Sequence, residues 1–216
     1  PVLSEHDDNI MLNETLFARI KTVYNEVDRK TLSAEENRLL DETYKNFVRS
    51  GADVVGEKKA RLKEINSRLA VLSRTYGDNL LAETNYFELY LTDSADLAGL
   101  PASSLAIAKE EAKNRKHDAG WSFTLQRPIV EAFLQSSAKP ELRKKMFDGY
   151  AMRGNNDNAN DNKAILEEMA NLRVERANIL GFKTHAEYEL ANSVAETTEA
   201  VYGFMDKLWP PALAMA

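Results

Sequence analysis

The sequence contains no cysteine, and glycine, proline and histidine are scarce. Without cysteine there can be no disulfide, no thiolate metal site and no thiol nucleophile. The 9 glycines and 6 prolines among 216 residues lie below the usual frequencies of about 7% and 5%. So few helix breakers predict long helices and argue against a β-sandwich. The length suits one domain, or two small ones, with a substantial hydrophobic core.

Charge and hydropathy argue against two classes of partner. Lysine and arginine number 28 against 34 aspartates and glutamates, a net charge of −6, so we expect no nucleic-acid partner. No apolar run approaches the roughly 18 residues of a membrane span, and none is predicted. Because the chain begins at Pro1 and stops at Ala216 inside an apparently helical stretch, we expect both ends to be truncated. A cytoplasmic location is favoured, with an exported parent protein as the alternative.

Apolar residues recur every three or four positions along most of the chain, which predicts amphipathic helices. Ser33 with Glu36, and Thr184 with Glu187, have the spacing of a capping box. The expected helices lie at about 14–29, 33–51, 57–84, 102–115, 140–152, 163–180 and from 197 onward, with a short one after Pro128.

Glycine and proline affect two of these helices. The helix over 57–84 should run through Gly77, because its apolar period continues in phase on both sides at a cost of about 1 kcal/mol. The last helix should kink or end at Pro210-Pro211. Its apolar residues Val201, Phe204, Met205 and Leu208 have no obvious partner, so we expect an exposed patch that drives self-association.

Two short segments depart from the helical period and are predicted as strands, at 86–91 and 121–126. The second alternates, which puts Trp121, Phe123 and Leu125 on one face. A two-stranded sheet is marginal alone, so this sheet should pack on the helices. The aromatic residues of the first strand are expected in the core rather than in a base-stacking platform. The predicted fold class is mainly α: a multi-helix domain with a small β-sheet.

The histidines do not form a zinc signature. His6, His117 and His185 are widely separated, and no His-Glu-x-x-His occurs. We therefore expect surface or capping histidines, and we assign no catalytic, cofactor-binding or metal-ligating residue in this chain. A Gly-x-Ser-x-Gly motif is also missing, so an acyl-transfer nucleophile has no local support.

The Asn/Asp-rich loop over 154–162 invites a calcium interpretation. Asp161 and Glu168 fall at ligand positions of an EF-hand loop that starts at Asp157. However, Ala159 lacks a side-chain oxygen and Asn162 replaces the required glycine. The favoured interpretation is a polar loop that caps the next helix through Asp161 or the asparagine before it.

Two other patterns have simple structural explanations. Residues 51–58 nearly spell a phosphate-binding loop, but Glu57 displaces the lysine and no Ser or Thr follows. A helix end at Gly51 and a helix start after Gly56 account for the glycines. Acidic residues dilute the basic clusters at 109–116 and 143–145, which we interpret as solvated helix faces.

Several segments, in the same order along the chain, resemble one family. They are Leu172–Phe182 with 186–188, Leu80–Asn85, Leu208–Leu213, Leu16–Ile20, and Arg153–Asn155 with 161–162. They resemble the thimet oligopeptidase family of zinc metallopeptidases, and within it the bacterial peptidyl-dipeptidase, or dipeptidyl carboxypeptidase, branch. The similarity covers essentially the whole chain.

The resemblance implies a fold and a parent activity. Such enzymes are mainly helical and enclose a deep channel that admits short peptides. Residues 1–216 would form an N-terminal helical channel-wall domain, partnered by the protein's own C-terminal catalytic half. There Zn²⁺ and a glutamate base would hydrolyse peptides and release C-terminal dipeptides. This sequence stops before those ligands occur, so we expect it not to bind the zinc and to be inactive alone.

Two hypotheses of another class stay open. The chain could be a stand-alone helical protein-interaction module without catalytic activity, which its amphipathic helices would suit. It could also be a calcium-binding helical protein that uses the loop between Asp157 and Glu168.

Overall fold

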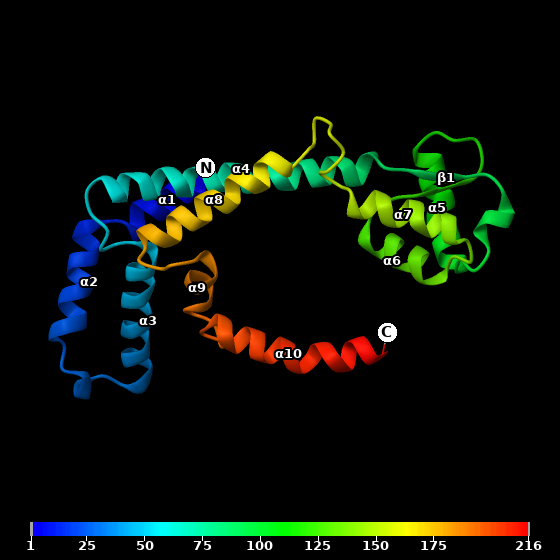
Figure 1. Ribbon diagram of the computed structural model, residues 1–216. Coiled ribbons are helices and arrows are strands. Elements are labelled where there is room, and N and C mark those ends of the chain that lie inside the picture. Colours follow the sequence, from blue (N-terminus) through cyan, green and yellow to red (C-terminus); the bar gives the residue numbers. More distant parts are fainter. Residues whose placement is uncertain (1, 216) are drawn as a thin grey trace. The chain divides into compact units, whose positions relative to one another are not determined.

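The computed structural model describes residues 2–215, which form ten α-helices and one two-stranded antiparallel sheet (Figure 1). The predicted mainly helical fold class with a small sheet is confirmed. The described residues divide into two compact units: 2–72 with 167–215, and 73–166. Helices α4 (Glu57–Tyr86) and α8 (Lys163–Ile179) contribute residues to both. Within 2–215 no helix is both long and apolar enough to cross a membrane.

The first unit contains an antiparallel helix pair, α2 (Glu14–Glu26) and α3 (Ala34–Ser50) (Figure 1). Phe17 stacks on Phe47 at 6.3 Å and on Tyr44 at 5.9 Å between ring centroids. Their burial joins the two helices through one aromatic cluster. The unit also includes the helices α1 (Val2–Met11), α9 (His185–Leu190) and α10 (Thr198–Met215) and a 3-10 turn, Arg29–Thr31.

Both predicted ends of α3 are confirmed. The Ser33 side chain accepts from the Glu36 amide, and the Glu36 carboxylate accepts from the Ser33 amide, which completes the capping box. Gly51 ends the helix in the left-handed region at φ 94°. An added Cβ there would lie 2.5 Å from a methyl group of Leu62, so the position needs glycine for conformation and for space.

Helix α4 continues through Gly77 as predicted. In the first unit it runs beside α8 (Figure 1), and two arginine–glutamate pairs join them: Arg61 Nε to Glu175 Oε1 at 2.7 Å, and Arg68 Nε to Glu168 Oε1 at 2.6 Å. The apolar residues of both helices are buried here: Leu62, Ile65, Leu69 and Leu72 of α4, and Met169, Leu172 and Ala177 of α8.

In the second unit the sheet packs on helices. Strand β1 (Leu89–Leu91) pairs with β2 (Trp121–Phe123), with Leu89 opposite Phe123. Around them lie a 3-10 turn, Ser94–Leu97, and the helices α5 (Ala102–Asn114), α6 (Arg127–Ser136) and α7 (Pro140–Ala151). Phe123 meets Phe133 of α6 edge-on at 4.9 Å, at the centre of this core.

The strand prediction was too long at both segments. Residues 86–88 are not strand, because the α4 hydrogen bonds continue to Phe87, whose amide donates to the Glu83 carbonyl at 3.1 Å. With β1 limited to three residues, 124–126 have no strand to pair with. Tyr86 therefore ends a helix and is 88% exposed, so its expected place in the core was wrong. Leu125 is buried without being strand.

Helix ends account for the other differences. The first predicted helix stops at Glu26. Helix α1 was not predicted, and none of its residues is buried. The Thr184 side chain accepts from the Glu187 amide, but the Glu187 carboxylate accepts from Lys183 instead of completing the box. Helix α10 does not end at Pro210-Pro211 but extends to Met215.

Candidate functional site

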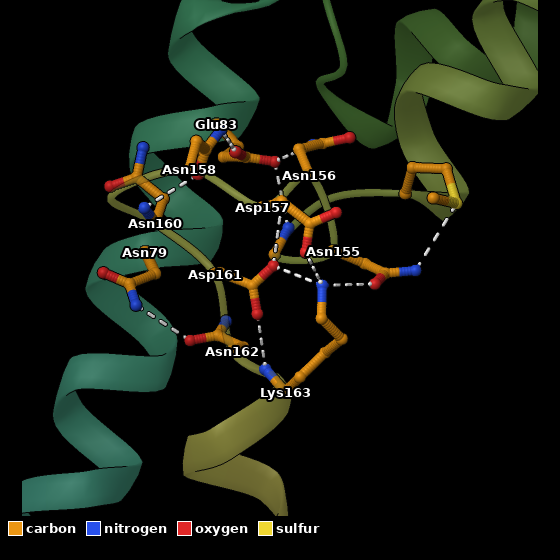
Figure 2. A network of polar contacts seen from close by, with 12 residues as sticks. Asn79, Glu83, Asn155, Asn156, Asp157, Asn158, Asn160, Asp161, Asn162 and Lys163 are labelled. Carbon is orange, nitrogen blue, oxygen red and sulfur yellow. Dashed lines mark hydrogen bonds and ion pairs between the residues drawn. The ribbon is translucent and has the colours of Figure 1, made fainter.

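The candidate site lies in the second unit, where the polar loop between α7 and α8 folds against α4 (Figure 2). Its centre is Glu83, a carboxylate on α4 that is only 7% exposed. The Gly154 amide donates to Glu83 Oε2 at 2.9 Å, and the amide groups of Asn156 and Asn158 donate to the two oxygens at 2.5 Å each. The loop thus supplies three hydrogen-bond donors to the buried carboxylate of Glu83.

Two opposing effects set the pKa of Glu83. Burial raises it, since the charged form loses hydration, but the hydrogen bonds from Asn158, Gly154 and Asn156 together lower it further. The net pKa lies below the ordinary value, so the side chain is ionised at neutral pH. Glu83 therefore stabilises the loop as an acceptor and is unsuited to act as a general acid.

A second clamp holds the loop to α4. Asn162 is 2% exposed, accepts at Oδ1 from Asn79 at 2.8 Å and donates to the Tyr76 carbonyl at 3.2 Å. Its backbone amide donates to the Gly154 carbonyl at 2.7 Å, which closes the loop on itself. The asparagine that spoils a calcium-binding pattern is therefore a buried structural residue.

Lys163 places an ammonium group among the loop oxygens (Figure 2). Its Nζ lies 3.0 Å from Asn155 Oδ1, 2.7 Å from Asp157 Oδ1 and 2.6 Å from Asp161 Oδ2. Hydrogen bonds to the two aspartates raise the pKa of Lys163, and the bond from Lys163 lowers the pKa of Asp161. These oxygens already have a cation, and residues 2–215 contain no group of three or more His, Asp or Glu side chains suited to hold a metal ion.

The structure also shows how the loop leads into α8. Asp161 Oδ1 accepts from the Lys163 amide at 2.9 Å, but the first hydrogen bond of α8 runs from the Leu166 amide to the Asn162 carbonyl at 2.9 Å. Asn162 is therefore the N-cap residue, and the predicted cap was one residue too early. Glu168, the last position of the calcium pattern, pairs with Arg68.

A pocket of about 1080 Å³ opens beside this loop within the second unit. Its apolar lining comes from Phe87, Leu125, Gly149 and Met152, and the exposed Tyr86 also lines it. Its charged lining includes Glu83, Glu88, Asp148, Arg115, Lys116 and Arg153. This mixture of apolar surface and ionised groups suits a small organic ligand better than a bare ion.

Next to the pocket, Glu88 joins Ser122 and His117. Ser122 Oγ donates to Glu88 Oε1 at 2.5 Å, and His117 Nε2 lies 2.9 Å from the same oxygen. Burial raises the pKa of Glu88, but these bonds lower it to below the ordinary value. The carboxylate lies between serine and histidine, so the histidine is not placed to deprotonate the serine. The three residues form a structural bridge between the sheet and the loop after α5.

The three histidines lie on separate elements. His6 is exposed on α1, and His117 stacks on Tyr90 with ring centroids 3.9 Å apart. His185 begins α9, stacks loosely on Tyr188, and has a pKa that burial lowers. The structure brings no two of them together as ligands among residues 2–215.

Sequence patterns missed Glu83, although a signal was present. The apolar stripe of α4 reaches Leu80, and Glu83 occupies the next position of that stripe, three residues on. A carboxylate on an otherwise apolar helix face predicts a buried acceptor with dedicated donors. Those donors, in the loop over 154–162, lie about 70 residues further along the chain.

Known proteins resemble this chain along nearly its whole length. The model of Peptidase family M3 matches residues 133–215. Dipeptidyl carboxypeptidase from Escherichia coli (strain K12) is 31% identical over 97% of this chain. Residues 133–215 thus resemble Peptidase family M3, and nearly the whole chain resembles part of an enzyme that is named as a peptidase. The predicted peptidase resemblance is thereby confirmed.

Other relatives have different names. Oligopeptidase A from Haemophilus influenzae is 32% identical over 96% of this chain. Probable cytosolic oligopeptidase A from Arabidopsis thaliana is 28% identical over 93%. The chain spans 31% of the length of the two bacterial relatives and 30% of the plant protein. Because the identities to differently named enzymes are similar, the comparisons do not single out one activity.

Proposed function

We propose that this chain is the N-terminal, helical channel-wall part, residues 1–216, of a zinc-dependent peptidyl-dipeptidase that releases C-terminal dipeptides from short oligopeptides. One observation carries the proposal: similarity to dipeptidyl carboxypeptidase extends over 97% of this chain but over only 31% of that enzyme. Short peptides would be its substrates, and the remainder of the longer protein would be its partner. A cytoplasmic location is part of the proposal, supported by a relative named as cytosolic.

The zinc ligands would come from outside this chain. The sequence has no His-Glu-x-x-His, and its histidines lie on α1, on the loop after α5 and on α9. His117 Nε2 is already committed to Glu88. Because these residues do not fit a catalytic zinc site, we derive no step through zinc within this chain, and we propose that the chain alone is inactive.

The test is to sequence the source gene beyond Ala216 and to assay the longer product. We expect the reading frame to encode His-Glu-x-x-His, and the product to release dipeptides from the C-terminus of a hexapeptide in a chelator-sensitive manner. Cleavage of the hexapeptide without release of a C-terminal dipeptide would favour an oligopeptidase over a peptidyl-dipeptidase. A stop codon directly after Ala216 would overturn the proposal.

One observation favours the alternative of a stand-alone helical interaction module. Helix α10 exposes Phe204, Met205 and Leu208, while Val201 is half-buried. An exposed apolar helix face can bind another protein as well as the remainder of its own chain. A stop codon after Ala216 together with a stable heterologous complex that Phe204→Ser abolishes would support this alternative.

A further inference from the structure

Two cations that line the pocket of the second unit have no carboxylate partner among residues 2–215. Lys116 lies in the turn after α5, in the left-handed region at φ 66°, with its side chain exposed. Arg153 follows α7 and donates to the Tyr150 carbonyl at 3.0 Å and to Thr84 Oγ1 at 2.8 Å. Its guanidinium also lies 3.8 Å from the centre of the Tyr150 ring. All of these partners are neutral.

The lining carboxylates, by contrast, are already occupied. Glu83 accepts from Gly154, Asn156 and Asn158, and Glu88 accepts from Ser122 and His117. Asp148 forms an ion pair with Lys144. The third lining cation, Arg115, is paired with Glu111 at 2.8 Å. The lining as a whole carries as many negative as positive side chains, because neutral donors do not cancel the charges of Glu83 and Glu88. Free hydrogen-bonding capacity, however, lies on the two cations, so an anionic group can bind Lys116 and Arg153 without displacing a carboxylate of the protein.

The rest of the lining indicates what the anion is attached to. Phe87, Leu125 and Met152 offer apolar surface, and Tyr86 offers an aromatic face that is 88% exposed. At about 1080 Å³ the pocket is much larger than an inorganic anion needs. The chemistry is that of a carboxylate joined to apolar groups.

We infer that this pocket binds the carboxylate-bearing part of a peptide, with the carboxylate at Lys116 and Arg153 and an apolar side chain against Met152 and Tyr86. The choice of a peptide rests on the proposed function. The carboxylate has two sources, the C-terminus of the peptide or an acidic side chain, and the same contacts would serve both.

The first experiment titrates the 216-residue chain with three N-acetylated hexapeptides by calorimetry. One has a free C-terminus and only uncharged side chains. The second is amidated and contains one glutamate, and the third is amidated and uncharged. We expect at least one charged peptide to bind about five times more tightly than the uncharged one, with an advantage that shrinks in high salt. Which charged peptide binds identifies the source of the carboxylate.

Variants then locate the contact. Lys116→Met should weaken the charged peptide about two- to five-fold and leave the uncharged peptide unchanged, because one exposed charge pair is removed. Lys109→Met is the matched control, since Lys109 is an exposed lysine of α5 that does not line this pocket. Tyr86→Ala should weaken all three peptides, since it removes the shared apolar contact.

Three results would overturn the inference: equal affinity for the charged and uncharged peptides, equal effects of Lys116→Met and Lys109→Met, or no binding of any peptide at millimolar concentration. These results concern binding alone and would leave dipeptide release by the longer protein untouched. Conversely, a longer product without peptidase activity would overturn the proposed function even if the pocket discriminates between the peptides.

Discussion

Replacing Glu83 should destabilise the second unit in a way that depends on pH. In Glu83→Ala, three donors lose their acceptor, and the Gly154 amide cannot turn away because it belongs to the backbone. An unsatisfied buried donor costs about 1–3 kcal/mol, and the asparagine amides can partly reorient, so we expect a loss of about 3 kcal/mol at pH 7. Glu83→Gln keeps one acceptor and should cost about 1–2 kcal/mol, the difference between charged and neutral hydrogen bonds.

The sign of the pH dependence follows from the pKa of Glu83. It is lower in the folded protein than its ordinary value of 4.5, so the ionised form is stabilised by folding. This contribution is fully present above about pH 4.5 and is lost as the pH falls through the folded-state pKa. The gap in stability between the wild type and Glu83→Gln should therefore be widest near pH 7 and should shrink on acidification below about pH 4.5.

Urea unfolding, followed by tryptophan fluorescence, measures this gap. Trp121 lies in β2 of the second unit and Trp209 in α10, so a Trp209→Phe background makes the signal specific to the second unit. Glu131→Gln is the matched control, because Glu131 is an exposed glutamate of α6 paired with Arg127. The control should not change the unfolding curve measurably. A gap for Glu83→Gln that stays constant between pH 7 and pH 3, or is no larger than that of the control, would refute the assigned role of Glu83.

Three further predictions concern the core, the loop and α10. Phe133→Ala should cost about 3–5 kcal/mol in urea unfolding because it empties the centre of the second core, whereas Phe147→Ala, at a side chain 57% exposed, should change little. Calcium titrated into the wild-type chain should produce no binding heat, because the Lys163 ammonium already lies among the loop oxygens; stoichiometric binding would contradict this. In analytical ultracentrifugation the wild-type chain should self-associate with rising concentration, and a Phe204→Ser/Leu208→Ser variant should stay monomeric. A wild-type chain that is monomeric at high concentration would argue against self-association through α10.

Local patterns predicted the helices wherever the apolar stripe was continuous. The capping box at Ser33 and the glycine at the other end of α3 were both correct, because these signals act within a few residues. The strands were predicted too long because aromatic composition does not show where α4 stops. Tyr86 is of a residue type that is common in strands, but it ends α4. The strand β1 therefore begins only at Leu89, and β2 can pair with only three residues.

The site was less predictable because its contacts join distant parts of the sequence. The loop over 154–162 could be recognised from its composition, but the predicted cap at Asp161 lies one residue before the actual N-cap position. Its attachment to Glu83 depends on the way α7 and α8 return the chain to α4, which no local pattern contains. That Lys116 and Arg153 lack a carboxylate partner among residues 2–215 likewise becomes visible only when every neighbouring carboxylate has been assigned its donors.

The most direct test of the proposed division of labour compares the purified 216-residue chain with the product of the full reading frame. Both are assayed for bound zinc and, by mass spectrometry, for dipeptides released from an N-acetylated hexapeptide. We expect stoichiometric zinc and chelator-sensitive release of C-terminal dipeptides only from the longer product. Stoichiometric zinc with dipeptide release by the 216-residue chain itself would contradict the proposal that the chemistry lies outside these residues.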